Sequence, residues 1–94
     1  MTEPRAWKLT VGGIVQGVGY RAFVSRKAKS YDLAGYVKNE DDGTVTIFVQ
    51  GPEDEVHAFV EEIRRPPFPA KVSYIKRKET TSDSNLREFI VVYR

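Results

Sequence analysis

The spacing of hydrophobic residues changes from strand-like to helix-like early in the chain. Over residues 7–15, apolar positions alternate with others, which predicts a half-buried β-strand. From Tyr20 to Tyr31 the apolar side chains recur at helical spacing, which predicts an α-helix. We expect this helix to end near Asp32, because aspartate tolerates a left-handed backbone better than most residues. The residues expected on its polar face are Ser25, Arg26, Lys29 and Ser30.

The middle of the chain predicts a β-hairpin followed by a second helix. Residues 35–39 and 44–50 have strand-like composition, and the Asp-Gly pair at 42–43 between them is a strong hairpin signal. The helix begins at Glu53, where acidic side chains suit the positive end of the helix dipole. Its expected buried stripe is Val56, Phe59, Val60 and Ile63.

Two more strands complete the pattern. A proline-rich connector at residues 66–69 leads into a strand over 70–78, in which Val72 and Ile75 are candidate core residues whose phase the spacing leaves open. The alternating residues of a last strand are Phe89, Val91 and Tyr93. The order is therefore β-α-β-β-α-β with one extra C-terminal strand. It predicts an α+β fold, the ferredoxin-like sandwich, with two helices on one face of a mainly antiparallel sheet.

Composition narrows the classes of function. The 94 residues indicate one domain over residues 1–94, and 40% hydrophobic with 30% charged residues is typical of a globular protein. There is no cysteine, which excludes thiolate metal sites and cysteine nucleophiles, and a single histidine leaves no histidine-based metal cluster. No secretory signal or membrane-spanning run is found, so we expect a cytoplasmic protein without a membrane partner. The net charge of +2 is too small to argue for nucleic acid.

The junction between the first strand and the first helix carries the strongest functional signal. Gly17 and Gly19 lie where the strand leads into the helix N-terminus, so backbone N–H groups and the positive end of the dipole converge on one spot. Arg21 adds a planar, charged fork suited to phosphate. Because the dipole disfavours a cation at a helix start, Arg21 indicates a shared anionic ligand, with an ion pair as the alternative.

Two segments together resemble the signatures of the acylphosphatase family. The first signature is matched by residues 13–21, GIVQGVGYR. The second is matched by residues 35–39, GYVKN, followed by Gly43, Val45 and Gly51. The resemblance runs essentially end to end. It implies an enzyme that hydrolyses a carboxyl-phosphate mixed anhydride, giving a carboxylate and inorganic phosphate.

The resemblance also implies which residues form the site. Arg21 is at the position of the arginine that binds the phosphoryl group, and Asn39 at that of the asparagine that orients the attacking water. No metal, cofactor or covalent phosphoenzyme is implied. Tyr20 replaces a more usual phenylalanine, so its hydroxyl needs a partner or solvent. The expected substrate-binding loop consists of Gln16, Gly17, Val18, Gly19, Tyr20 and Arg21.

Other residues with chemical potential have simpler interpretations. His57 lies beside Val56 on the second helix, and we expect it at the surface rather than in catalysis. Asp41 and Asp42 form a pair of carboxylates that turn chemistry explains. Without the signature, Asn39 at a strand end would itself be a turn former.

Two alternatives to a free-standing, monomeric enzyme remain open. A non-catalytic regulatory module would keep the phosphate site without turnover, and acylphosphatase-like domains also occur within larger proteins such as a hydrogenase-maturation carbamoyltransferase. An RNA-binding domain shares the element order, but it needs an aromatic-rich basic signature on its third strand, where residues 44–49 offer one aromatic residue. We therefore expect a small-molecule acyl phosphate as the partner and no nucleic acid.

Overall fold

Seven helices and strands follow one another in residues 4–93, the part of the chain that the computed structural model describes. They are β1 (Arg5–Ile14), α1 (Tyr20–Ser30), β2 (Ala34–Asn39), β3 (Val45–Gly51), α2 (Glu53–Ile63), β4 (Lys71–Thr80) and β5 (Phe89–Val92). The predicted order is confirmed, with boundaries within two residues of the predicted ones. Asp32 has a φ of 60°, so the left-handed residue after α1 is confirmed as well. Neither α1 nor α2 is long and apolar enough to cross a membrane.

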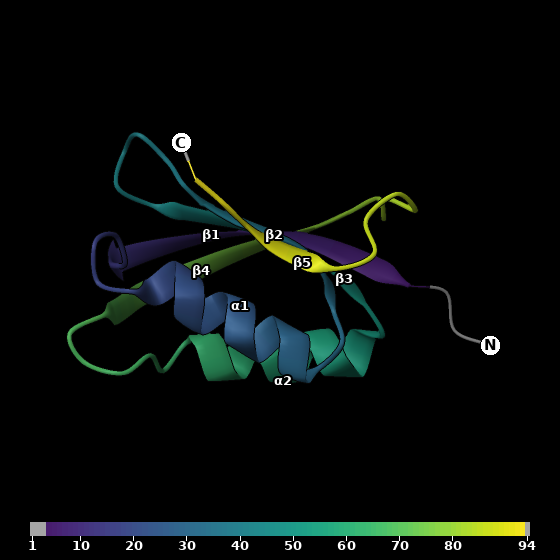
Figure 1. The fold of residues 1–94 in the computed structure, drawn as a ribbon, viewed down its shortest axis with the longest axis horizontal. Coiled ribbons are helices and arrows are strands. Elements are labelled where there is room, and N and C mark those ends of the chain that lie inside the picture. Colours follow the sequence, from purple (N-terminus) through teal and green to yellow (C-terminus); the bar gives the residue numbers. More distant parts are fainter. Residues whose placement is uncertain (1–3, 94) are drawn as a thin grey trace.

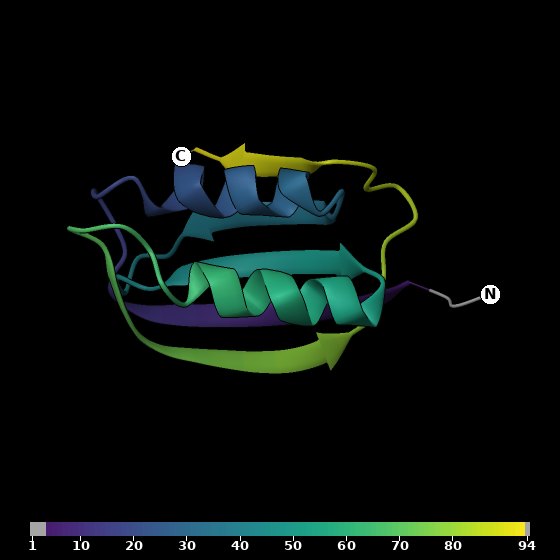
Figure 2. The same ribbon diagram turned by 90° about the horizontal axis from the view of Figure 1, so that it is seen from below.

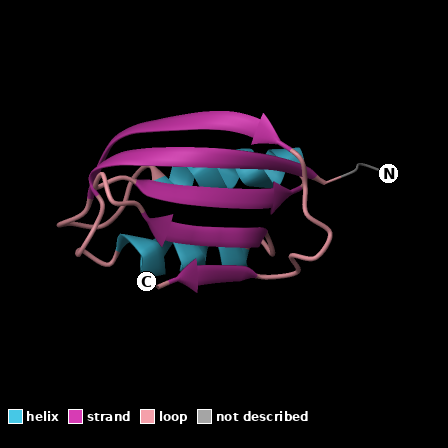
Figure 3. Ribbon diagram, turned by 90° about the horizontal axis from the view of Figure 1, so that it is seen from above, coloured by secondary structure: helices cyan, strands magenta, loops and turns pink. Residues whose placement is uncertain are grey.

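The strands form one sheet in the order β4-β1-β3-β2-β5. Neighbouring strands are antiparallel except for β2 and β5, which run parallel. Both helices pack on the same face of the sheet (Figures 1 and 2). The opposite face carries no helix within residues 4–93 (Figure 3). This two-layer arrangement is the predicted ferredoxin-like α+β sandwich with its extra C-terminal strand.

The core lies between the helices and the sheet. Its fully buried strand residues include Leu9, Val11, Val37, Val45, Ile47 and Val49. The predicted stripe of α2 is confirmed, since Val56, Phe59, Val60 and Ile63 are all buried. The assignment of Ser25 to the polar face of α1 is wrong, because α1 contacts α2, β2 and β5 together and buries a wide arc of its surface.

A bulge explains the phase of β4. Val72 and Ile75 both pack against the core, although their odd spacing would place them on opposite faces of a regular strand. The register between β1 and β4 shifts so that Gly12 pairs with Tyr74 but Gly13 pairs with Val72. The extra residue on β4 reverses which side chains face the core at that point. The sequence of β4 alone does not determine this change.

The end of the last strand is placed by its parallel pairing. β5 ends at Val92, which is paired with Lys38 near the end of β2. Tyr93 therefore lies just beyond the strand and is 74% exposed, rather than continuing the alternation. As a result, the ends of β2 and β5 lie together at one edge of the molecule.

Candidate active site

Three segments that are distant in sequence meet at one end of the molecule. They are the loop from β1 to α1, the hairpin turn from β2 to β3 and the end of β5 (Figure 1). Between them is a cleft of about 460 Å³, lined by Gln16, Arg21, Asn39, Glu40, Asp41, Val92 and Tyr93. The two residues predicted to be catalytic, Arg21 and Asn39, therefore line the same cleft.

The loop before α1 has the backbone shape that its glycines permit. Gly17 and Gly19 have φ values of 74° and 78°, in the left-handed region that glycine adopts most easily. A Cβ at either position would meet no atom within 4 Å, so conformation rather than space requires glycine there. Gly19 is the N-cap of α1 and provides no side-chain cap, and the first turn has no acidic residue. The loop and helix N–H groups can therefore serve an anion.

A smaller hollow of about 210 Å³ continues the cleft over this loop. It is lined by Val15, Gly17, Gly19, Tyr20, Arg21, Ala22 and Tyr93. Arg21 and Tyr93 line both spaces, so these two residues lie where the hollow over the glycine loop meets the Asn39 side of the cleft.

Arg21 is held by the end of the last strand. Its Nη1 donates a hydrogen bond of 2.8 Å to the carbonyl oxygen of Val92, and its guanidinium lies 4.8 Å from the centroid of the Tyr93 ring. No carboxylate among residues 4–93 forms an ion pair with it. The ion pair considered as an alternative is therefore not formed in this part of the chain, and the remaining N–H groups of the fork are available to an anionic ligand.

Asn39 is the last residue of β2, and its side-chain oxygen has an unusual position. Oδ1 is buried and has no hydrogen-bond partner among the described residues. Buried polar atoms are nearly always paired, so this orphaned carbonyl oxygen remains able to accept a hydrogen bond from an O–H donor that reaches it. A water molecule is such a donor.

Gln16 joins the two halves of the site, which the sequence analysis missed. Its Nε2 donates hydrogen bonds of 2.8 Å to the carbonyl oxygens of both Glu40 and Thr44. These carbonyls belong to the hairpin turn that follows Asn39. The side chain thus fastens the glycine loop to the turn, a role that only the three-dimensional contact reveals.

Val18 and Tyr20 direct their side chains away from the cleft. Val18 packs against the core. Tyr20 is buried, and its hydroxyl donates a hydrogen bond of 2.9 Å to the carbonyl oxygen of Ile63. Burial also raises the pKa of this hydroxyl far above its usual value. The partner that Tyr20 needs is therefore a backbone carbonyl at the end of α2, and only the backbone of these two residues can serve a ligand.

Comparison with known proteins now decides the family. The sequence model of the acylphosphatase family matches residues 7–91. The chain belongs to the acylphosphatase family. The family resemblance and the class of enzyme that it implies, a hydrolase acting on phosphorus-containing acid anhydrides, are thereby confirmed.

Individual acylphosphatases match over nearly their full length. That of Chlorobaculum tepidum is 41% identical over 92 residues, covering 98% of this chain and 99% of the relative. The crystal structure of acylphosphatase from Bacillus subtilis matches with a TM-score of 0.89 at 40% identity. The match covers 95% of this chain and 99% of that one. Full-length HypF is matched at a TM-score of 0.85 and 31% identity, but this chain covers only 12% of it.

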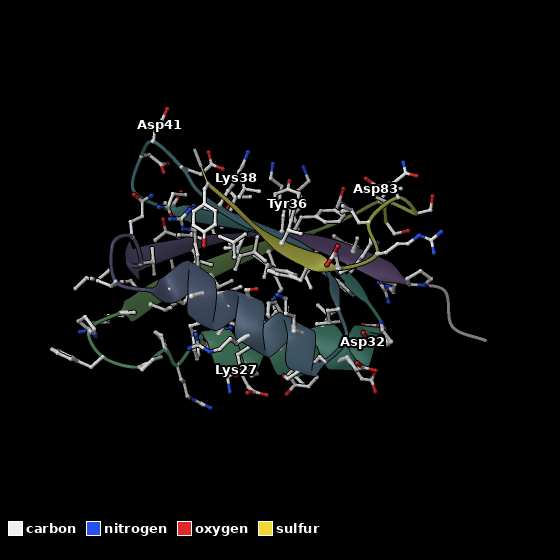
Figure 4. The ribbon with its side chains drawn as sticks, viewed as in Figure 1. Lys27, Asp32, Tyr36, Lys38, Asp41 and Asp83 are labelled. Carbon is white, nitrogen blue, oxygen red and sulfur yellow. The ribbon has the colours of Figure 1, made fainter. Side chains whose placement is uncertain are left out.

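Two acidic residues also line the acylphosphatase cleft, Glu40 and Asp41, and the sequence analysis assigned only Asp41 to turn chemistry. Glu40 forms an ion pair of 3.8 Å with Lys38, while Asp41 is exposed at the tip of the hairpin (Figure 4). Asp42 accepts hydrogen bonds from the N–H and the hydroxyl of Thr44, as a turn residue does. The signal that could have located Glu40 and Asp41 is their position directly after Asn39.

The remaining titratable residues are not arranged as a metal centre. Among residues 4–93, no three histidine, aspartate or glutamate side chains are grouped to hold a metal ion. His57 is exposed on α2, next to Glu53 at 3.3 Å, which confirms its expected surface position.

Proposed function

We propose that this chain hydrolyses acyl phosphates to a carboxylate and inorganic phosphate, without a metal or cofactor. The observation that carries the proposal is that Arg21, which forms no ion pair within residues 4–93, and Asn39, whose Oδ1 has no hydrogen-bond partner there, line one cleft. The first suits a phosphoryl group and the second suits the water that attacks it. Membership of the acylphosphatase family supports the same chemistry.

In this proposal the phosphoryl group is held by Arg21 and by backbone N–H groups of residues 16–21. Charge spreads over the phosphoryl oxygens in the transition state, and a fixed cation with oriented amides stabilises it without reorganisation. The bond to Val92 and the contact with Tyr93 limit the rotamers of Arg21 before substrate arrives. Preorganisation of this kind lowers the entropy cost of reaching the reactive geometry.

Asn39 would position the attacking water. Its Oδ1 accepts one water proton as a hydrogen bond, which directs a lone pair of the water oxygen toward phosphorus. The new P–O bond forms as the bond between phosphorus and the acyl oxygen breaks, and the carboxylate leaves with that electron pair. Because an amide is not basic, a phosphoryl oxygen of the substrate takes the water proton. A pH profile of kcat without a steep limb near neutrality is expected.

The cleft is large enough for a small-molecule substrate, and we propose that the protein acts on such substrates as a cytoplasmic monomer. Full-length HypF, of which this chain covers 12%, has a crystal structure in a phosphate- and nucleotide-bound form. The competing proposal for this chain is a module that binds phosphate without turnover. That reading predicts phosphate binding at the same Arg21 but no hydrolysis, so activity of the unmodified chain separates the two.

Hydrolysis of benzoyl phosphate, followed with and without EDTA, tests the proposal. We expect turnover that survives EDTA and is competitively inhibited by inorganic phosphate. Arg21→Ala should lower kcat by ~10²–10³ and weaken phosphate inhibition. Arg26→Ala, an exposed arginine of the same helix outside the cleft, is the matched control and should behave like the unmodified chain. An inactive wild type that still binds phosphate would replace this proposal with the regulatory module.

A further inference from the structure

The uncovered face of the sheet presents a continuous row of side chains across all five strands. Lys8 on β1 is paired with Lys78 on one side and with Phe48 on the other. Phe48 is in turn paired with Tyr36, and Tyr36 with Ile90 on β5. Paired residues point to the same face, so these side chains form one line on the face that Figure 3 shows free of helices.

Two aromatic rings stack at the centre of this row. The centroids of Tyr36 and Phe48 are 5.7 Å apart and their planes differ by 13°. Both residues are half-buried although no helix covers them. Figure 4 shows Tyr36 on the side of the sheet away from the helices. Each ring covers part of the other, and the parts left exposed form an aromatic surface in the middle of the uncovered side of the sheet.

Positive charge lies beside this aromatic pair. Lys76 is paired with Thr10, in the row next to that of Lys8 and Lys78, and its Nζ lies 5.6 Å from the centroid of the Tyr74 ring. Lys8, Lys76 and Lys78 form no ion pair with any residue in 4–93. Like charges directly opposite each other destabilise a strand pair, so the Lys8–Lys78 pairing favours an anion between them.

The acidic hairpin turn limits the positive surface. A shallow hollow on this face runs from Lys8 and Thr10 to the carboxylates of residues 40–42. Lys38 lies at the acidic end, where it forms an ion pair with Glu40. The surface suited to an anion is therefore the part toward β4, which we call the open-face cluster and define as Lys8, Tyr36, Phe48, Lys76 and Lys78.

We propose that the open-face cluster binds single-stranded nucleic acid. Phosphates would lie over the three lysines, and unpaired bases would stack on the Tyr36–Phe48 pair. An acidic protein would use the lysines but has no need of a stacked aromatic surface. The sequence analysis expected no nucleic acid because the net charge is only +2 and the third strand has one aromatic residue. The second ring comes from β2, and only the strand pairing brings the two together.

Fluorescence anisotropy of a labelled oligothymidylate, titrated over a range of salt concentrations, tests this inference. With three lysines on phosphates, the logarithm of affinity should fall with the logarithm of salt with a slope of about −2. The Lys8→Gln/Lys78→Gln double variant should reduce the slope to about −0.7. Its melting temperature should stay the same or rise, because the repulsion between the two lysines is removed. Tyr36→Leu and Phe48→Leu should each weaken binding by about fivefold or more.

Two controls decide what the result means. Lys29→Gln removes an exposed lysine of α1 on the other layer and should leave affinity and slope unchanged. Inorganic polyphosphate, which has charge but no bases, should compete poorly. Absence of binding at low salt would overturn the inference. So would leucine variants that bind like wild type while polyphosphate competes fully, because the cluster would then be a site for acidic partners. Benzoyl phosphate hydrolysis is an independent readout, since the open-face cluster lies outside the cleft.

Discussion

The guanidinium of Arg21 lies 4.8 Å from the centroid of the Tyr93 ring, just beyond the last strand. The proposed phosphate-binding side chain is thus supported by a residue near the C-terminal end. A cation–π contact at an exposed site contributes about 0.5–1 kcal/mol. We predict that Tyr93→Leu raises KM for benzoyl phosphate by about two- to fivefold. Tyr93→Phe keeps the ring and should retain the wild-type KM. If the phenylalanine variant were as impaired as the leucine variant, the hydroxyl rather than the ring would be the group that matters.

Gly19 provides a second prediction, because its φ of 78° is strained for any residue with a side chain. Gly19→Ala should cost about 1–2 kcal/mol of stability and also lower kcat/KM, since relaxation of the loop would turn its N–H groups away from the phosphoryl group. Gly43→Ala is the matched control, with a φ of 93°, open space around it and a place outside the cleft lining. Gly43→Ala should lose stability but keep the wild-type kcat/KM. Equal losses of activity in both variants, measured well below the melting temperature, would argue against the loop backbone as a ligand.

Tyr20 yields a prediction about stability. Its buried hydroxyl donates to the carbonyl oxygen of Ile63, one of the α2 carbonyls left free at the helix end. Tyr20→Phe keeps the packing but leaves that buried acceptor without its donor, so the free energy of unfolding should fall by about 1–3 kcal/mol. Urea denaturation measures the change. Tyr36→Phe on the open sheet face serves as the control, and a similar loss there would show that the Ile63 hydrogen bond is not the cause.

Stability at low pH should depend on Asp42. The hydroxyl and then the N–H of Thr44 donate to its carboxylate and lower the pKa of Asp42 from its ordinary value of 3.8. A folded pKa below the unfolded one stabilises the fold at pH above about 4, and this contribution is lost as pH falls through the folded pKa. Asp42→Asn should therefore flatten the pH dependence of the unfolding free energy between about pH 5 and pH 2. A pH dependence in Asp42→Asn as steep as in the wild type would contradict this assignment.

The element order could be predicted because each element has a local cause. The Asp-Gly pair forms the hairpin turn, in which Gly43 has a positive φ. Asp32 follows α1 with a left-handed backbone, and the buried residues of α2 recur at helical spacing. Each of these depends on residues close together in the chain. Ser25 shows the limit of such reasoning, because its burial depends on how many neighbours α1 has rather than on the pattern within α1.

The site could be predicted only in part, for the same reason. The family resemblance indicates Arg21 and Asn39, but local pattern says nothing of what supports them. The carbonyl that anchors Arg21 belongs to Val92, 71 positions away, and reaches it only because β5 is parallel to β2. Gln16 reaches the hairpin carbonyls across 24 and 28 positions. Contacts of this range follow from strand pairing, which no periodicity within a single strand determines.

Asn39→Ala tests the central claim most directly. The variant should lower kcat for benzoyl phosphate by about 10²-fold or more, because the attacking water is no longer held in line. The inhibition constant of inorganic phosphate should stay at the wild-type value, since Arg21 and the loop remain. Asn85→Ala, an exposed loop asparagine, controls for the substitution itself. Near-full turnover by Asn39→Ala, with phosphate inhibition unchanged, would contradict the account.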